Sequence, residues 1–487
     1  MKATKIVLLS LVFLFLFYGC GLSPHIEPAL NKKISRDDSV EKFILANGLT
    51  VVAKRMTKAP LVSIELLVKT GSAGEGNYLG TGIAHFTEHM LFKGNEKGKA
   101  GDIARQIKQL GGDIDGFTNY DCTGFAITVP RENLGCALEI LSGMVFSPHF
   151  DKEQFDKELN VILNEIRMNE DAPERRLSRL FWANAYLTHP YRHPVIGYRN
   201  LLAKLTPEDL SAFHKSEYVP NNMVLSVAGD FNREDLKSLV ENKILVPERG
   251  AEKEIFYFPE DSPVSPRYYE EGFDTKIMYL LTGFQGTGIS DDDLFALDIL
   301  SIIFGEGDSS RLGSRLRLKE NIVYSILSFN HTPKDKGIFG IFLTAEYKDK
   351  ELIEKEIIEE IEKIKKYSVR KDELERAKNI VISRFNFARE TVESQALELA
   401  SNEFFIGDPD FNARYVEGVK GVTRGDLTRV ARKYLHLSKL ITVVLRPQDA
   451  VRKKEIKDTS ASRGEIEEIK FENGLTLLLR EERSLPL

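Results

Sequence analysis

The chain has 487 residues, of which 42% are hydrophobic and 29% are charged. This composition is that of an ordinary globular protein and excludes a multispan membrane protein, a collagen and a mainly disordered chain. Lys and Arg number 67 against 73 Asp and Glu, a net charge of −6, which argues against nucleic acid as a partner because such binding needs a basic face. Three cysteines provide neither a disulfide framework nor a four-cysteine zinc site.

The N-terminus has the pattern of an export signal. Within residues 1–20, Lys2 and Lys5 precede an almost wholly apolar run over 6–18, which suits a signal-peptide core and is short for a membrane span. A glycine then precedes Cys20, which is similar to the lipobox of bacterial lipoproteins, although the residues before it are bulkier than that pattern prefers. We expect Cys20 to be lipidated; a cleaved signal peptide and an uncleaved anchor are the alternatives.

Export of this kind predicts a cell-envelope protein, anchored to the membrane on the periplasmic side by its lipid or signal segment. Residues 21–40 are polar and predict a tether. Cys122 and Cys136 are predicted to be structural free thiols, since a single pair would be a thin disulfide framework. Palmitate labelling that survives Cys20→Ser would contradict lipidation at this residue.

Strand and helix patterns alternate in the first half of the mature chain. Asn47 and Gly48 form a strong turn signal between apolar runs and predict a hairpin over 43–54. Periodicity then predicts strands at 62–68, 123–129 and 223–228, and helices at 80–92, 100–110, 134–146 and 152–169.

A proline-containing stretch at 251–267 predicts a linker, after which the pattern restarts. The interleaving of strands and helices indicates an α+β or α/β class. The sequence therefore predicts two domains of similar size, at 41–250 and 268–450. In the second domain, strands are predicted at 276–283, 324–329 and 338–344, and helices at 291–304 and 349–367.

The C-terminus repeats the start of the first domain. The run NGLT occurs at 47–50 and again at 473–476, an offset of 426, and the same offset places Pro60-Leu61 on Pro486-Leu487. We expect a second copy of the unit to begin near 465, so that 465–487 is the start of a truncated repeat. DNA downstream of this frame that encodes nothing similar to residues 62–450 would contradict that prediction.

The central chemical signal is HFTEH at 85–89. His85 and His89 lie four residues apart on a predicted helix, so they share a face and can chelate one cation, with Glu88 on the same side. This is the H-x-x-E-H arrangement, the inverse of H-E-x-x-H. Two histidines and a carboxylate suit zinc with one open position. In such a site the metal acidifies water and polarises the scissile carbonyl, while Glu88 moves the proton to the leaving amine.

The third ligand is expected on the helix that contains ELNVILNEI. Glu158 and Glu165 are seven residues apart, two helical turns, and share a face. Glu165 is the predicted ligand. Glu158 is the predicted supporting carboxylate, which accepts a hydrogen bond from a ligand histidine and orients its ring.

Each of these residues also has a simpler interpretation, in which it binds no metal. Two histidines and an acid also occur on solvated helix faces, but this helix is apolar around them, and three buried ionisable groups are costly unless they are paired or bind metal. Glu165 by itself is equally compatible with a surface acid, because its helix is rich in carboxylates. The remaining histidines of the mature domains are expected to be structural: His149, His189, His193, His214, His331 and His436.

Together these residues resemble the pitrilysin/insulinase family of zinc peptidases, over about residues 40–450. The resemblance rests on the inverted motif, on a glutamate 76 positions after His89, and on the segments GGDIDGFTNYDCTGF, ELNVILNEI, HPYRHPVIG and YVPNNMVLSVAGDF. It implies an α+β fold of two similar domains, each a mostly antiparallel sheet flanked by helices. It also implies one zinc ion per chain and a peptide or unfolded-protein substrate held as an extra strand at a sheet edge.

The resemblance also implies residue roles. His85, His89 and Glu165 would bind the metal. Glu88 would act as the base, and Glu158 would support a ligand histidine. In GEGDSSRLGSRLRLKENIVYSI, Arg317 and Tyr324 match the family's arginine–tyrosine pair and would contact substrate or clamp the closed state. A surface cation and a core aromatic are their plainer alternatives.

The chain departs from the family at the edge-strand segment. Asp115 and Gly116 stand where the family commonly has Asn-Ala. An ionised Asp115 cannot donate a hydrogen bond to a substrate carbonyl as an amide can, so substrate register or preference is expected to differ. The family's cleft needs two facing halves, which predicts a homodimer or a second homologous half or subunit.

The leading hypothesis is a zinc endopeptidase acting on peptides or unfolded proteins in the cell envelope. The first alternative is a non-catalytic subunit that binds peptides or scaffolds an envelope complex, and the second is a zinc hydrolase for a non-peptide substrate. The complete set His85, Glu88, His89 and Glu165 favours the peptidase.

Overall fold

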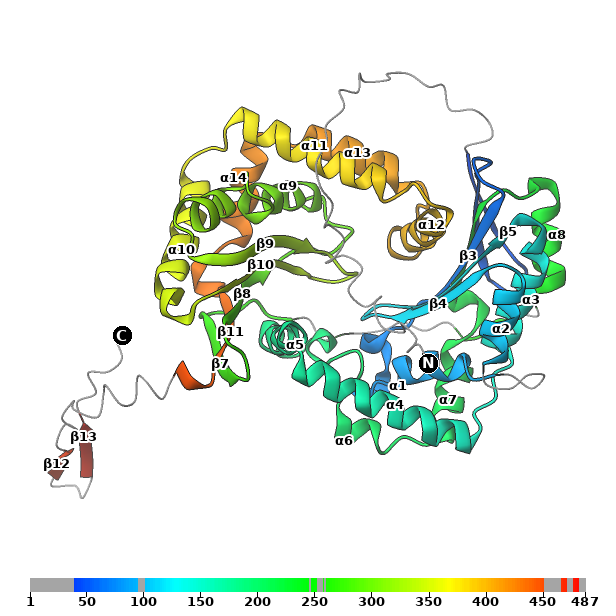
Figure 1. Ribbon diagram of the computed structural model, residues 1–487, viewed down its shortest axis with the longest axis horizontal. Coiled ribbons are helices and arrows are strands. Elements are labelled where there is room, and N and C mark those ends of the chain that lie inside the picture. Colours follow the sequence, from blue (N-terminus) through cyan, green and yellow to red (C-terminus); the bar gives the residue numbers. More distant parts are fainter. Residues whose placement is uncertain are drawn as a thin grey trace.

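The computed structural model describes residues 39–94, 101–244, 247–251, 257, 260–450, 466–470 and 476–480. Two sheets, each flanked by helices, form the two lobes of the molecule, and a short hairpin lies apart at its C-terminal end (Figure 1). Across these described ranges, no helix combines the length and apolar character needed to span a membrane. Cys20 and residues 1–38 lie outside the described residues, so lipidation and location stay predictions.

The first sheet has six strands in the order β1-β2-β6-β3-β5-β4. All neighbouring strands are antiparallel except β2 and β6, which pair in parallel. Among the described residues no further strand pairs with β4, which is therefore the edge of this sheet. The strands are β1 (Val40–Ile44), β2 (Thr50–Arg55), β3 (Leu61–Val68), β4 (Asp113–Thr118), β5 (Thr123–Pro130) and β6 (Met223–Gly229).

Helices cover one face of this sheet and build the larger core. Along β3, Val62, Ile64 and Leu66 join that core, whereas Leu67 belongs to a smaller cluster on the opposite face. This alternation follows from the period of two in a strand. The helices of this lobe are α1 (Ile83–Leu91), α2 (Asp102–Gln109), α3 (Leu134–Phe146), α4 (Lys152–Asp171), α6 (Arg199–Leu202), α7 (Pro207–Glu217) and α8 (Arg233–Lys243).

The second sheet has five strands in the order β7-β11-β8-β10-β9, with β7 and β11 parallel and the other pairs antiparallel. The strands are β7 (Arg267–Phe273), β8 (Met278–Gln285), β9 (Val323–His331), β10 (Ile338–Ala345) and β11 (Ile441–Pro447). The helices are α9 (Leu294–Gly305), α10 (Lys350–Lys366), α11 (Lys371–Phe387), α13 (Phe411–Gly421) and α14 (Arg424–Tyr434). This arrangement confirms the predicted fold class.

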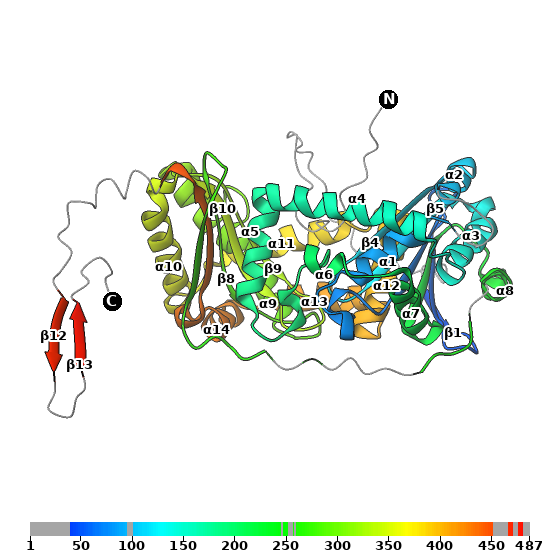
Figure 2. The same cartoon turned by 90° about the horizontal axis from the view of Figure 1, so that it is seen from below.

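Each lobe receives one helix from the sequence of the other (Figures 1 and 2). Helix α5 (Pro173–Ala185) precedes the linker but packs on β8 and β11 of the second sheet. Helix α12 (Val392–Ile406) comes from the second half but packs on β2, β3 and β6 of the first sheet. The two halves are therefore interlocked in space, although they are consecutive in sequence.

The C-terminal hairpin repeats the pairing of the N-terminal hairpin. Strand β12 (Ile466–Lys470) pairs antiparallel with β13 (Thr476–Arg480), and Lys470 opposes Thr476. In the first sheet Ile44 opposes Thr50, at the same offset of 426. The repeat signal therefore coincides with a repeated register, while a second copy of the whole unit stays a prediction.

Most elements predicted from periodicity lie within three residues of a strand or helix in the structure. Strand β4 was not predicted from periodicity, because its sequence DIDGFT has no apolar alternation and its residues are mostly half-buried or exposed. Cys122 is buried, Cys136 is exposed, and both are free thiols, as predicted.

Candidate metal centre and active site

Helix α1 places the HFTEH motif at the junction of the first sheet and α4. Its apolar side chains, including Ile83, Phe86 and Met90, are fully buried and fix the rotation of the helix. The helix begins after Gly82, which has φ of +74°, and a Cβ there would lie 2.3 Å from the Ile196 carbonyl oxygen. Only glycine allows this close approach without strain.

A buried glutamate holds the start of the same helix. Both carboxyl oxygens of Glu75 accept backbone N–H bonds, from Gly80 at 3.0 Å, Gly82 at 3.3 Å and Ala84 at 3.1 Å. Burial raises the pKa of Glu75 to about 8, against the effect of these hydrogen bonds. The N–H groups that a helix leaves unpaired at its N-terminus are thus satisfied from inside the fold.

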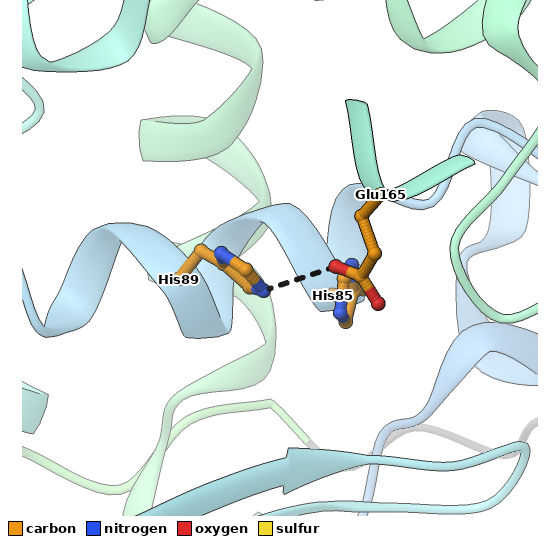
Figure 3. A group of neighbouring side chains, drawn as sticks. All are labelled: His85, His89 and Glu165. Carbon is orange, nitrogen blue, oxygen red and sulfur yellow. Dashed lines mark ion pairs between the residues drawn. The ribbon is translucent and has the colours of Figure 1, made fainter. Parts of the chain in front are cut away.

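The structure brings together the three predicted metal ligands (Figure 3). His85, His89 and Glu165 each offer one ligand atom, and these atoms lie within 4.8 Å of one another. The closest recorded approach joins His89 Nε2 and Glu165 Oε2 at 4.0 Å. Glu165 reaches the histidines because α4 packs directly on α1.

Glu158 lies behind His89 in the supporting position. Its Oε1 is 2.8 Å from His89 Nδ1, which leaves Nε2 facing Glu165. Its other oxygen pairs with Lys93 Nζ at 2.7 Å. Burial acts to raise the pKa of Glu158, but the hydrogen bonds from His89 and Lys93 outweigh it and lower the pKa. Sequence reasoning missed Lys93, although its position four residues after His89 was a usable signal.

Glu88 is buried beneath the edge strand β4. Its Oε2 accepts a 2.9 Å hydrogen bond from the Thr118 hydroxyl, and its Oε1 lies 3.2 Å from where a Cβ on Gly116 would be. Burial raises the pKa of Glu88 to about 7, a value at which a carboxyl group can both take and return a proton near neutral pH. Sequence reasoning also missed Thr118, because nothing local indicates that β4 crosses α1.

The residues present fit a zinc ion. The Nδ1 atom of His85 is buried and has no hydrogen-bond partner among the described residues, an arrangement that is costly unless another group satisfies the ring. Burial also lowers the pKa of His85 well below its ordinary value, which favours the neutral ring that a metal ligand needs. Two imidazoles and one carboxylate form a common donor set for catalytic zinc.

The other predicted site residues lie elsewhere. Asp115 is on β4, next to Gly116, with an exposed side chain. Arg317 and Tyr324 are in the second lobe, both exposed, where Arg317 pairs with Asp308 and Tyr324 donates to Glu346. Their recorded polar partners are all in that lobe, so within one chain they are not joined to the metal ligands.

The second lobe has the corresponding helix without the ligands. Helix α9 packs on the edge strand β9 as α1 packs on β4, but its sequence, LFALDILSIIFG, is almost wholly apolar.

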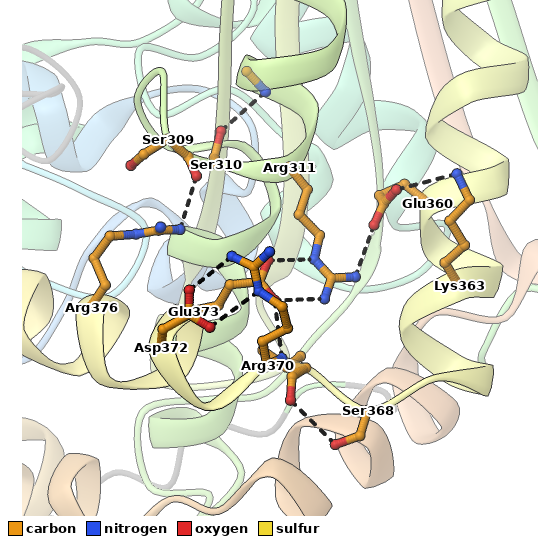
Figure 4. Close-up of polar contacts among 12 residues, drawn as sticks. Ser309, Ser310, Arg311, Glu360, Lys363, Ser368, Arg370, Asp372, Glu373 and Arg376 are labelled. Carbon is orange, nitrogen blue, oxygen red and sulfur yellow. Dashed lines mark hydrogen bonds and ion pairs between the residues drawn. The ribbon is translucent and has the colours of Figure 1, made fainter.

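The second lobe also contains an arginine–glutamate cluster. Arg311 lies just before the π-helix Gly313–Lys319, which carries Arg317. It makes two hydrogen bonds to Glu373 and one to Glu360 (Figure 4). In the described part of the chain, the group in the first lobe is the only His/Cys/Asp/Glu cluster of metal-site geometry.

Comparisons with known proteins show the family of the chain. Residues 50–198 match the insulinase family, peptidase family M16, and residues 204–381 match the peptidase M16 inactive domain. An uncharacterized zinc protease of Rickettsia felis is 31% identical over 411 residues, which cover 83% of this chain and 97% of that protein. The zinc protease PqqE of Helicobacter pylori is 29% identical over 446 residues, 88% of this chain and 96% of that protein.

Solved structures give the same result. A protease from Helicobacter pylori superposes with a TM-score of 0.79 at 28% identity, covering 84% of this chain and 100% of that one. A Pseudomonas fluorescens structure described as a peptidase M16 inactive domain shares the fold, with a TM-score of 0.76 at 22% identity, covering 84% and 98%. The chain therefore belongs to the insulinase family of peptidases, family M16, as the sequence resemblance predicted.

Proposed function

We propose that this protein is a zinc-dependent endopeptidase that hydrolyses peptides or unfolded proteins. The observation that carries the proposal is the convergence of His85, His89 and Glu165, with Glu88 beside them but outside the ligand set. The zinc-protease names of the M16 relatives support the same metal. When bound, zinc supplies Lewis acidity, which polarises a peptide carbonyl and acidifies water.

The chain's own residues supply the rest of the chemistry. His85, His89 and Glu165 would hold the ion, and Glu158 would keep the His89 ring in place through Nδ1. Glu88 would take a proton from the attacking water and give it to the leaving amine, and the Thr118 hydroxyl fixes the orientation of its carboxylate. No other described strand pairs with the outer side of β4, and its backbone groups there would hold an extended peptide beside Glu88.

The decisive test compares four proteins on a quenched peptide substrate. Glu88→Gln should lose at least about 10²-fold in activity, the usual contribution of a general base, while retaining one zinc per chain. Glu165→Ala should lose zinc, whereas Glu170→Ala, an exposed glutamate on the same helix, should change neither zinc content nor cleavage relative to the unmodified protein. Chelator should abolish cleavage. Activity that persists in the Glu88→Gln protein rejects the mechanism, and zinc and peptide binding without cleavage favours a non-catalytic peptide-binding subunit.

We also propose that a second copy of the chain, or a homologous half, supplies the facing side of the cleft. Arg317 and Tyr324 are exposed and make no recorded contact with the metal ligands of their own chain, so they are available to another. Sedimentation analysis of the purified protein tests this proposal: a strictly monomeric chain that is fully active contradicts it.

A further inference from the structure

The edge strand β4 presents two chemically different faces to any peptide that pairs with it. Gly116 and Thr118 lie against Glu88 on the face toward α1. Asp113, Asp115 and Phe117 alternate with them and therefore lie on the opposite face. Phe117 packs there with the cluster under α12.

Asp115 is the unusual residue on that face. Its Oδ1 accepts the backbone N–H of the next residue, Gly116, at 2.9 Å, and within the described ranges no lysine or arginine pairs with it. Helix α12 packs mainly on β2, β3, β5 and β6, and Phe117 is the β4 residue that joins the cluster beneath it. Among the described residues, the Asp115 carboxylate therefore has no paired cation, and it lies at the edge of the sheet.

Asp113, two residues earlier on the same face, differs in one respect. Its carboxylate already pairs with Lys108. A peptide strand along β4 would therefore meet one neutralised carboxylate, one unpaired carboxylate and one aromatic ring at successive same-face positions.

In a sheet, directly opposed residues of neighbouring strands place their side chains on the same face and within contact distance. We propose, on the basis of the peptidase function above, that Asp115 makes the enzyme selective for substrates with a lysine or arginine at the position opposite Asp115. The residue two positions along, opposite Phe117, would be apolar. The preferred substrate is therefore a peptide with a basic residue opposite Asp115 and an apolar residue opposite Phe117.

The test uses a host peptide in which arginine, its neutral analogue citrulline, or glutamate is placed at each position in turn. Cleavage by the active protein and anisotropy binding to the zinc-loaded Glu88→Gln protein are both measured. We expect arginine to exceed citrulline about two- to fivefold at one position only, the size of a favourable cross-strand charge pair. Asp115→Asn should remove this difference in both assays, and Asp113→Asn should leave it unchanged.

The outcomes separate this inference from the proposed function. Cleavage without a positional arginine preference, or a preference that survives Asp115→Asn, overturns the inference and leaves the peptidase intact. Arginine-selective binding that depends on Asp115, in a protein that never cleaves, supports the selectivity while rejecting catalysis. If Asp113→Asn removes the arginine preference as fully as Asp115→Asn does, general surface charge causes the preference, and the inference is overturned.

Discussion

Lys93 closes a short polar chain behind the candidate metal ligands. It pairs with one oxygen of Glu158, and the other oxygen holds His89. Without its cation, Glu158 would be a buried carboxylate free to rotate away from the imidazole. Partners that orient a ligand in this way commonly contribute 10- to 100-fold in metal affinity.

We therefore expect Lys93→Met to weaken zinc binding by about tenfold, because it removes the charge that fixes Glu158. Lys93→Arg should restore most of the affinity, since it keeps a charged donor. Zinc affinity is measured by competition with a chromogenic chelator, alongside thermal unfolding of the metal-free protein. Unchanged zinc affinity in Lys93→Met would show that the contact is only structural.

Glu65 is a second buried carboxyl group, away from the metal ligands. It lies on β3, is 2% exposed, and its Oε1 has no hydrogen-bond partner among the residues that the structure describes. Burial, and then the negative charge of Asp115, raise its pKa to about 8. The folded state therefore favours the protonated acid, whereas the unfolded chain ionises it at an ordinary pKa near 4.5.

This shift has a defined consequence for stability. Below about pH 4.5 the group is protonated in both states and has no pH-dependent effect. Between about pH 4.5 and 8, Glu65 ionises in the unfolded state but stays protonated in the folded state. The contribution of Glu65 to the free energy of unfolding therefore falls as pH rises, and this contribution levels off above pH 8.

Glu65→Gln removes this titration. We expect the variant to gain stability relative to the unmodified protein as pH rises from 5 to 8, by on the order of 3 kcal/mol. Urea unfolding at several pH values measures the difference. An exposed control, Glu153→Gln, should show a far smaller trend because it is solvated. Parallel pH profiles for Glu65→Gln and the unmodified protein would show that Glu65 does not carry this penalty.

At the scale of single elements, α1 depends on an internal carboxylate. The helix is nine residues long, and short helices gain most of their stability from tertiary contacts. Glu75 accepts three backbone N–H groups around its N-terminus. The orientation of the metal-binding helix is thus fixed by a residue outside the HFTEH motif.

Removing this carboxylate should destabilise the first lobe. Glu75→Ala leaves three buried donors unpaired and is expected to cost about 3 kcal/mol or more, measured by urea unfolding. Glu208→Ala, an exposed first-turn glutamate of α7, should stay within about 0.5 kcal/mol. A Glu75→Ala protein as stable as the control would contradict this role.

At the scale of the whole molecule, the exchange of α5 and α12 joins the lobes. Helix α12 covers apolar residues of the first sheet, such as Leu67 and Val224, and α5 contributes Phe181 to a cluster with Val443 of the second sheet. Arg176 on α5 also makes a two-point ion pair with Glu271 on β7. Neither lobe can keep its core covered if the other unfolds.

We therefore expect the two lobes to unfold together. Trp182, the only tryptophan of the chain, lies on α5 and stacks on Tyr186 at the junction, so its fluorescence reports on this contact. Thermal transitions followed by Trp182 fluorescence and by far-ultraviolet circular dichroism should coincide. Two separate transitions would show that the lobes are independent domains.

Local sequence patterns were sufficient for much of the fold and for five residues of the candidate site. Helical periodicity placed His85, Glu88 and His89 on one face, and the two-turn spacing did the same for Glu158 and Glu165. The hairpin signal at Asn47-Gly48 and the long amphipathic helices were equally direct, because a turn or a helix face depends on residues a few positions apart.

Tertiary structure decided the contacts between segments that are far apart in the sequence. Helix α4 packs on α1 and brings Glu165 to the histidines, and Thr118 of β4 reaches Glu88. Helices α5 and α12 each pack on the other lobe. All of these contacts follow from how hydrophobic faces cover one another. No short window of sequence encodes which face covers which. By itself, the sequence determined which residues could bind a metal and do proton chemistry; the packing of elements far apart in the chain determined that they meet.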